Sequence, residues 1–180
     1  IKEAQSLDFS AGRIYFDADT HFNYNFGADD FTVETWVDCR STNGMAVFNQ
    51  SDSNAGSNSS FILWVSGGII GFYTTNSTGW THNIEPGINI ANTGWRHIAA
   101  TRKGNTMYMF IDGKQVGSLD MSGVTIASST RDLEIGAQTN AGRFTGSIAD
   151  SRISSIARSI TTDDGSEIFP VPNKPYEMDD

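Results

Sequence analysis

Short runs of apolar or alternating residues, broken by Gly, Asn and Asp, recur along the whole chain. Alternation with a period of two is typical of β-strands, and no amphipathic stretch with helical spacing accompanies it. The pattern predicts strands at residues 6–9, 13–16, 31–39, 45–50, 61–65, 69–75, 81–84, 95–102, 106–111, 115–119, 132–137 and 144–153.

Tight turns separate several of these strands. Asp112-Gly113 between two strands predicts a type I′ hairpin, because both central residues of that turn need a positive φ. Gly104-Asn105 and Gly67-Gly68 give weaker signals of the same kind. Two-residue connections join only antiparallel strands, so the sequence predicts an all-β sandwich of two packed antiparallel sheets.

The tail of the chain differs from the rest. Pro170, Pro172 and Pro175 favour an extended path and are excluded from the centre of a sheet. We therefore predict one sandwich domain over residues 1–162 and a proline-containing extended strap over residues 163–180.

Composition narrows the classes of function. The chain has 180 residues, a net charge of −9, 11% aromatic and only 18% charged residues, which indicates a folded domain with a neutral-polar surface. No basic stripe is present, so a nucleic-acid partner is not expected. The longest apolar runs have the length of strands, so membrane insertion is not expected either. Cys39 is the single cysteine and has no partner for an internal disulfide.

Aromatic residues on the non-core side of strands are the main candidates for binding. Alternation puts Phe31, Val33, Thr35 and Val37 on the core face, and it leaves Trp36 beside Glu34 on the other. Trp64 and Tyr108 lie in strands that are apolar on both sides, and Trp80 lies in a long polar spacer. Rings on a sheet can stack on sugars, so the sequence predicts a non-core sheet surface carrying Trp36, Trp64 and Tyr108. Glycan recognition is predicted through these three residues and Trp80, with Glu34 as a polar partner. The alternative is that these rings fill gaps under a loop or at a subunit contact, which leaves an oligomer open.

Five motifs follow one another in a familiar order: residues 30–37, 95–102, 112–114, 133–136, and 144–148 leading to 152–153. Together they resemble the laminin-G-like, concanavalin A-like lectin/glucanase superfamily. The resemblance implies a jelly-roll sandwich and a binding or adhesive role, often towards carbohydrate.

The same resemblance implies a calcium ion in some members. Asp17 and Asp19, in a long acidic loop, are the candidate ligands, because calcium favours carboxylates in irregular loops. The alternative is a solvated acidic loop. Where the family commonly shows two acidic residues after 146–148, this chain has Ala149 and then Asp150, which puts any ion site using the first acid in doubt.

Catalysis is not expected. The glucanases of this superfamily carry Glu-x-Asp-x-x-Glu along one strand, and no such triplet occurs here. An enzyme acting on polysaccharide is the weaker alternative, and it requires two carboxylates roughly 5–10 Å apart in a cleft.

The ending at residues 152–158, with its proline-rich continuation, resembles such domains in phage tail and virion proteins. It predicts a location on a virion or another extracellular surface. The alternative to glycan recognition is then a pure assembly or decoration protein that contacts other virion proteins.

Overall fold

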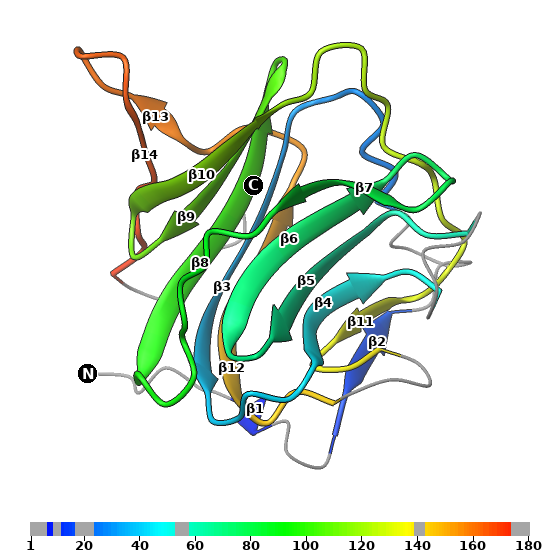
Figure 1. Cartoon of the computed structure of the whole chain (residues 1–180), viewed down its shortest axis with the longest axis vertical. Coiled ribbons are helices and arrows are strands. Elements are labelled where there is room, and N and C mark those ends of the chain that lie inside the picture. The colour runs from blue at the N-terminus through cyan, green and yellow to red at the C-terminus, as the bar shows by residue number, and fades with distance from the viewer. Residues whose placement is uncertain (1–6, 9–11, 17–23, 53–57, 139–142, 174–180) are drawn as a thin grey trace.

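A computed structural model describes residues 7–8, 12–16, 24–52, 58–138 and 143–173 (Figure 1). The strands are β1 Leu7–Asp8, β2 Ile14–Phe16, β3 Phe31–Cys39, β4 Met45–Gln50, β5 Phe61–Ser66, β6 Ile69–Thr75, β7 Trp80–Ile84, β8 Trp95–Lys103, β9 Thr106–Ile111, β10 Lys114–Asp120, β11 Leu133–Ile135, β12 Gly146–Ser154, β13 Ile160–Thr161 and β14 Glu167–Ile168. Strands β3, β4, β6 and β9 have the predicted bounds, and the strands predicted from residue 13 onward otherwise differ by one or two residues at one or both ends. The ends of the strand predicted at residues 6–9 lie outside the described residues.

The strands form two layers (Figure 1). One sheet has eight strands in the order β1-β12-β3-β8-β9-β10-β14-β13, and the other has six in the order β2-β11-β4-β5-β6-β7. Every pair of neighbouring strands within each sheet is antiparallel. The predicted all-β sandwich of two antiparallel sheets is therefore confirmed.

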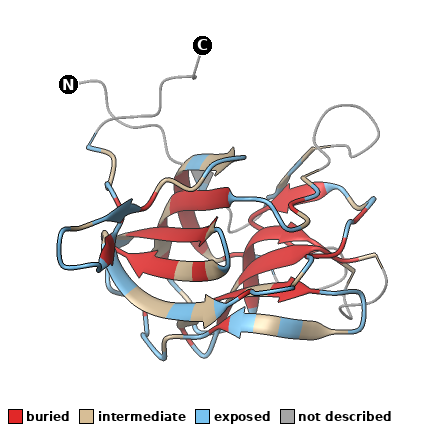
Figure 2. Cartoon of the chain, turned by 90° about the horizontal axis from the view of Figure 1, so that it is seen from above, coloured by how far each residue is buried: buried red, intermediate tan, exposed pale blue. Residues whose placement is uncertain are grey.

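The core lies between the layers, where the buried residues of both sheets face one another (Figure 2). Phe31, Val33 and Val37 of β3 contribute from the eight-stranded sheet, and Phe61 and Leu63 of β5 contribute from the six-stranded sheet. The core face predicted for β3 is confirmed. Alternation turns the residues between them towards the outer faces of the sheets, where Thr32, Glu34 and Ile62 are nevertheless buried by other contacts.

Hairpin turns are present at all three predicted positions, but at Gly104-Asn105 only Gly104 has a positive φ, of 58°, so this turn is not of type I′. Asp112 and Gly113 have φ values of 50° and 83°, and Gly67 and Gly68 have values of 61° and 82°. The Asp112-Gly113 pair thus has both positive φ values of a type I′ turn and joins β9 to β10.

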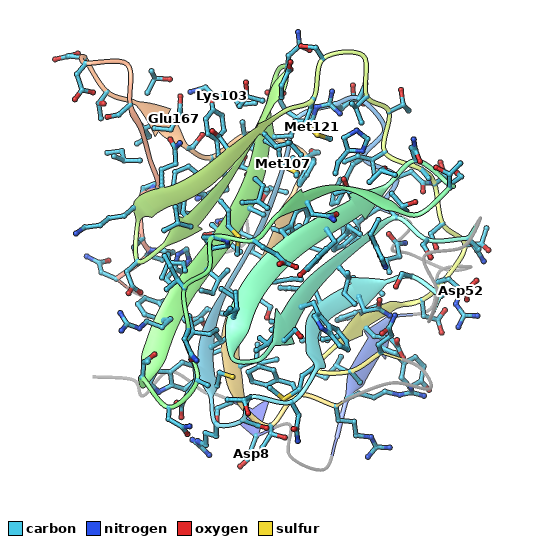
Figure 3. All side chains as sticks on the ribbon, in the orientation of Figure 1. Asp8, Asp52, Lys103, Met107, Met121 and Glu167 are labelled. Atoms are coloured by element: carbon cyan, nitrogen blue, oxygen red, sulfur yellow. The ribbon has the colours of Figure 1, made fainter. Side chains whose placement is uncertain are left out.

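Two short strands in the segment after β12, residues 155–173, which we call the tail, were not predicted. Strand β14 pairs with β10, and β13 pairs with β14, so together they form a ribbon at the edge of the eight-stranded sheet. Glu167 of the ribbon forms an ion pair with Lys103 of β8 at 3.0 Å, and Figure 3 shows the two side chains close together. After β14, Phe169 donates its backbone N–H to the Gly113 carbonyl at 3.0 Å. The segment is thus attached to the sheet by backbone and side-chain contacts, while the domain boundary at residue 162 stays a prediction.

No helix in the described part of the chain is long and apolar enough to cross a membrane. Cys39 is buried as a free thiol at the end of β3, and burial raises its pKa.

Candidate functional site

The aromatic residues predicted to share one surface lie on two opposite faces. Trp36 and Tyr108 belong to β3 and β9 of the eight-stranded sheet, together with Glu34. Trp64 and Trp80 belong to β5 and β7 of the six-stranded sheet. The expectation of a single surface was wrong, because alternation fixes the side on which a residue projects but leaves open which sheet its strand joins.

The outer face of the eight-stranded sheet is largely covered by the tail. Phe169 packs on Phe110 and His97, with ring centroids 5.4 and 5.5 Å apart, and Tyr108 is partly buried against this cluster. The Trp36 ring meets His97 edge-on at 5.3 Å. Tyr108 thus lies in the cluster under Phe169, in line with the alternative that the sequence left open, and Trp36 packs beside His97 of the same cluster.

Glu34 is fully buried in the same place. Its carboxylate lies 3.3 Å from His97 Nε2 and 3.0 Å from Arg158 Nε, and Arg158 belongs to the tail segment after β12. A buried carboxylate needs such partners because desolvation of an unpaired charge is costly. The contacts of Glu34 therefore favour a structural role in attaching the tail.

The outer face of the six-stranded sheet carries a group of rings that we call the aromatic surface: Trp64, Tyr73 and Trp80. A Cβ atom built on Gly44 would approach the Trp64 indole to 2.8 Å, so the indole lies over the Gly44 backbone. A Cβ atom on Gly71 would approach Tyr73 Cε2 and the Tyr73 hydroxyl oxygen to 2.9 Å, so the Tyr73 ring lies over Gly71. The two glycines thus let two rings lie down on the sheet.

The other partners of Tyr73 fix the position of its ring. Its hydroxyl donates a hydrogen bond to Glu85 Oε1, and Trp80 packs edge-on against it with centroids 6.3 Å apart. Burial raises the pKa of the Tyr73 phenol, and the hydrogen bond and charge of Glu85 raise this pKa further. The phenol therefore stays protonated as a donor to Glu85 at neutral pH.

A cross-strand row links the aromatic surface to the far edge of the same sheet. Its register partners run across all six strands in the order Tyr15, Glu134, Asn49, Ile62, Tyr73 and Asn83. Five strand spacings of about 4.8 Å give this row a length of about 24 Å. Tyr15, at its end, is 62% exposed, and the Arg13 guanidinium lies 5.9 Å from the centre of its ring.

Glu134, on the strand next to this edge, is buried, and both of its carboxylate oxygens accept hydrogen bonds. Arg13 Nη1 donates to Oε1 at 2.8 Å, and Asn49 Nδ2 donates to Oε2 at 2.9 Å. Beside it lies a polar pocket of about 260 Å³, lined by Ser51, Thr130, Arg131, Asp132 and Glu134. The side chains of Ser51, Arg131 and Glu134 are held by partners outside the pocket lining, such as Asn49, Asp52 and Arg13.

The calcium site predicted from the sequence stays a prediction. The predicted ligands Asp17 and Asp19 lie outside the described residues. Within the described ranges, no three His, Cys, Asp or Glu side chains gather as a group able to hold a metal ion.

Sequence reasoning missed three residues of this face: Tyr15, Tyr73 and Glu85. The first two share the outward parity of their strands with other side chains, so nothing in the alternation distinguishes them. The useful signal was Gly71, two residues before Tyr73 in an otherwise apolar strand, since glycine inside a strand marks a close approach of another group.

A family model described as the concanavalin A-like lectin/glucanases superfamily (Laminin_G_3) matches residues 11–162. The chain belongs to this laminin G-like family. The resemblance found in the sequence is thereby confirmed, and with it the jelly-roll class of sandwich.

Solved structures share the laminin G-like fold at low sequence identity. The binding domain of Paraclostridial Mosquitocidal Protein 1 is similar with a TM-score of 0.64 and 15% identity over 87% of this chain and 43% of that one. Mouse laminin α1 domains LG4-5 give 0.62 and 16% over 94% and 48%. The ligand binding domain of botulinum neurotoxin serotype D, in complex with N-acetylneuraminic acid, gives 0.60 and 18% over 87% and 42%.

This chain therefore spans less than half the length of these three structures. A search of curated protein sequences gave no match.

Proposed function

We propose that this laminin G-like chain is a non-enzymatic binding module that recognises glycan through the aromatic surface of its six-stranded sheet. The observation that carries the proposal is the placement of Trp64 and Tyr73 over Gly44 and Gly71. Rings that lie on a sheet present a flat face outward, and such a face suits the apolar C–H side of a sugar while nearby polar groups bind its hydroxyls. The neurotoxin domain in complex with N-acetylneuraminic acid supports a carbohydrate as the class of ligand.

A glycan array followed by calorimetry, with calcium present and then chelated, tests the proposal. Trp64→Ala should weaken binding about tenfold or more, because a central aromatic contact is commonly worth at least ~1.4 kcal/mol. Trp95→Ala is the matched control, since Trp95 is 43% exposed on the eight-stranded sheet. Absence of any glycan binding, or equal loss in both variants, would overturn the proposal. Binding that disappears on chelation would assign a role to calcium.

The alternative of an assembly protein has its own supporting observation. Ile156, Ile160 and Ile168, all in the segment after β12, are 56%, 50% and 43% exposed. Ile160 and Ile168 are direct partners across the β13–β14 ribbon, so their side chains lie together on one side of it. Sedimentation at rising concentration, compared with Ile160→Asp, tests this surface. A monomer at all concentrations with no affinity for virion proteins argues against it.

The enzyme alternative depends on the polar pocket. Asp132 and Glu134 both line it, but both Glu134 oxygens accept hydrogen bonds from Arg13 and Asn49. These bonds favour a structural carboxylate. Release of reducing ends from a polysaccharide by the natural chain, but not by Glu134→Gln, would overturn the non-enzymatic part of the proposal.

We also propose a virion or another extracellular surface as the location. The neutral-polar composition and the resemblance of residues 152–158 to phage tail and virion domains support this proposal. Tail or capsid genes beside the gene for this chain would strengthen this proposal. Neighbouring genes that encode cytoplasmic enzymes would count against the proposal.

A further inference from the structure

The aromatic surface lies in a long stretch of chain without basic residues. Residues 41–95 contain no Lys or Arg, and their acidic residues are Asp52 and Glu85. This stretch includes β4, β5, β6 and β7, which are four neighbouring strands of the six-stranded sheet. The rings are therefore carried by the part of the sheet that has no permanent cation of its own.

Glu85 is the charged group that touches the aromatic surface. It is exposed at the end of β7, and its Oε1 accepts the Tyr73 hydroxyl. Its Cγ also lies beside Gly71, 2.9 Å from where a Cβ atom would stand, so the carboxylate is next to the ring that covers this glycine. Because the Glu85 residue is exposed, its carboxylate is accessible from solvent beside the Tyr73 ring.

The arginines of this sheet lie at its opposite edge. Arg13 precedes β2 and is bound to Glu134 at 2.8 Å, while Arg131 precedes β11 and forms an ion pair with Asp52 at 3.1 Å. Arg143 forms an isolated antiparallel backbone β-bridge with Ala137, just after β11. Strand β4 separates β11 from β5, so all three arginines are attached to the far side of the sheet from Tyr73. Residues 17–23, 53–57 and 139–142 contain no Lys or Arg in their sequence.

From this distribution of charge we propose that the aromatic surface binds uncharged glycans and discriminates against anionic ones. The inference rests on the proposed glycan function and specifies its ligand class. An anionic sugar stacked on Tyr73 would bring its charge to roughly 5 Å from the Glu85 carboxylate, and strands β4 to β7 supply no Lys or Arg to offset the repulsion. A neutral sugar instead offers hydroxyl donors to the same carboxylate, which forms stronger hydrogen bonds than a neutral acceptor does.

Matched pairs of oligosaccharides test the proposal by calorimetry on the full chain. Each pair consists of a neutral sugar and the same sugar bearing one sialic or uronic acid, such as lactose and sialyllactose. The neutral member should bind about tenfold more tightly or better in dilute buffer, which corresponds to one like-charge contact at a partly exposed site. The preference should shrink in 0.5 M NaCl, because salt screens exposed charges.

Variants of Glu85 show whether the carboxylate is the cause. Glu85→Gln keeps an acceptor for the Tyr73 hydroxyl and should reduce the preference to about threefold or less, and Glu85→Lys should reverse its sign. Asp163→Asn is the control, because it removes one exposed negative charge from the turn between β13 and β14 and should leave the preference unchanged. Circular dichroism verifies that each variant is folded.

The possible outcomes separate the two proposals. If neither member of any pair binds, the glycan function itself is wrong. If the anionic member binds as tightly or more tightly, the glycan function stands and the charge preference is overturned. If the neutral preference survives Glu85→Gln and high salt unchanged, its electrostatic origin is overturned.

Discussion

Phe169 should be the residue that holds the tail on the eight-stranded sheet. Its side chain is 3% exposed and packs on Phe110 and His97, next to Ala99. Replacing a buried Phe with Ala typically costs ~3–5 kcal/mol. Because Phe169 lies in a tail segment at the outer surface, neighbouring side chains can partly close the gap, so Phe169→Ala should cost about 3 kcal/mol.

Two measurements follow this loss. In a domain of this size each kcal/mol lowers Tm by about 2–4 °C, so the melting temperature should fall by roughly 6–12 °C if the tail and sandwich unfold together. If the tail opens locally, the amide of residue 169, which is bonded to the Gly113 carbonyl, should exchange on the order of 10²-fold faster while global stability changes less.

Ile168→Ala is the matched control for both measurements. Ile168 precedes Phe169 directly and is 43% exposed, so its truncation should cost less than about 1 kcal/mol. If the two variants agree within about 0.5 kcal/mol and the amide exchange is unchanged, the ring does not hold the tail and the reasoning fails. Glycan binding on the opposite sheet should be the same in both variants.

Two further predictions concern a carboxylate and a glycine. The Thr162 and Ser166 hydroxyls and the Ser166 backbone N–H bind the Asp164 carboxylate and lower its pKa to about 2. Because the folded-state pKa is below the ordinary value of 3.8, this carboxylate stabilises the fold above about pH 4, and its contribution is lost as pH falls towards 2. NMR titration of the Asp164 carboxyl should show the low midpoint. A midpoint near 3.8 would refute these hydrogen bonds. Gly146→Ala should lower the free energy of unfolding in urea by more than about 3 kcal/mol. Residue 146 has a φ of 140°, and a Cβ atom there would collide with the Asp38 carbonyl oxygen. A loss below ~1 kcal/mol would show that the strand can shift aside.

The sequence predicted the strands well because their signals are local. Alternation places the bounds of β3 and β4, and the Asp112-Gly113 turn sets the β9–β10 hairpin. Strands β13 and β14 were missed because each has two residues, too few for a period to show. Their pairing depends on β10, which no pattern inside the tail encodes.

The candidate site was only half predicted, for a different reason. Trp36 and Trp64 have the same signal in sequence, an aromatic ring on the non-core side of an apolar strand. Trp36 packs against His97 on the eight-stranded sheet, and Trp64 lies over Gly44 on the opposite sheet. The two rings are distinguished by their contacts with residues that are distant in sequence, and alternation along one strand carries no information about such contacts.

The position of the aromatic surface has a consequence for how the chain acquires its structure during synthesis. Strands β4, β5, β6 and β7 follow one another as a meander of neighbouring pairs, so each can pair soon after it leaves the ribosome. Strand β3, in contrast, waits for β8 and then for β12, whose residues are translated much later. Pairings with large sequence separation form slowly. Strands β4 to β7, which carry the rings, are therefore expected to pair before the eight-stranded sheet is complete, and the tail can dock on that sheet only after β8, β9 and β12 have been translated.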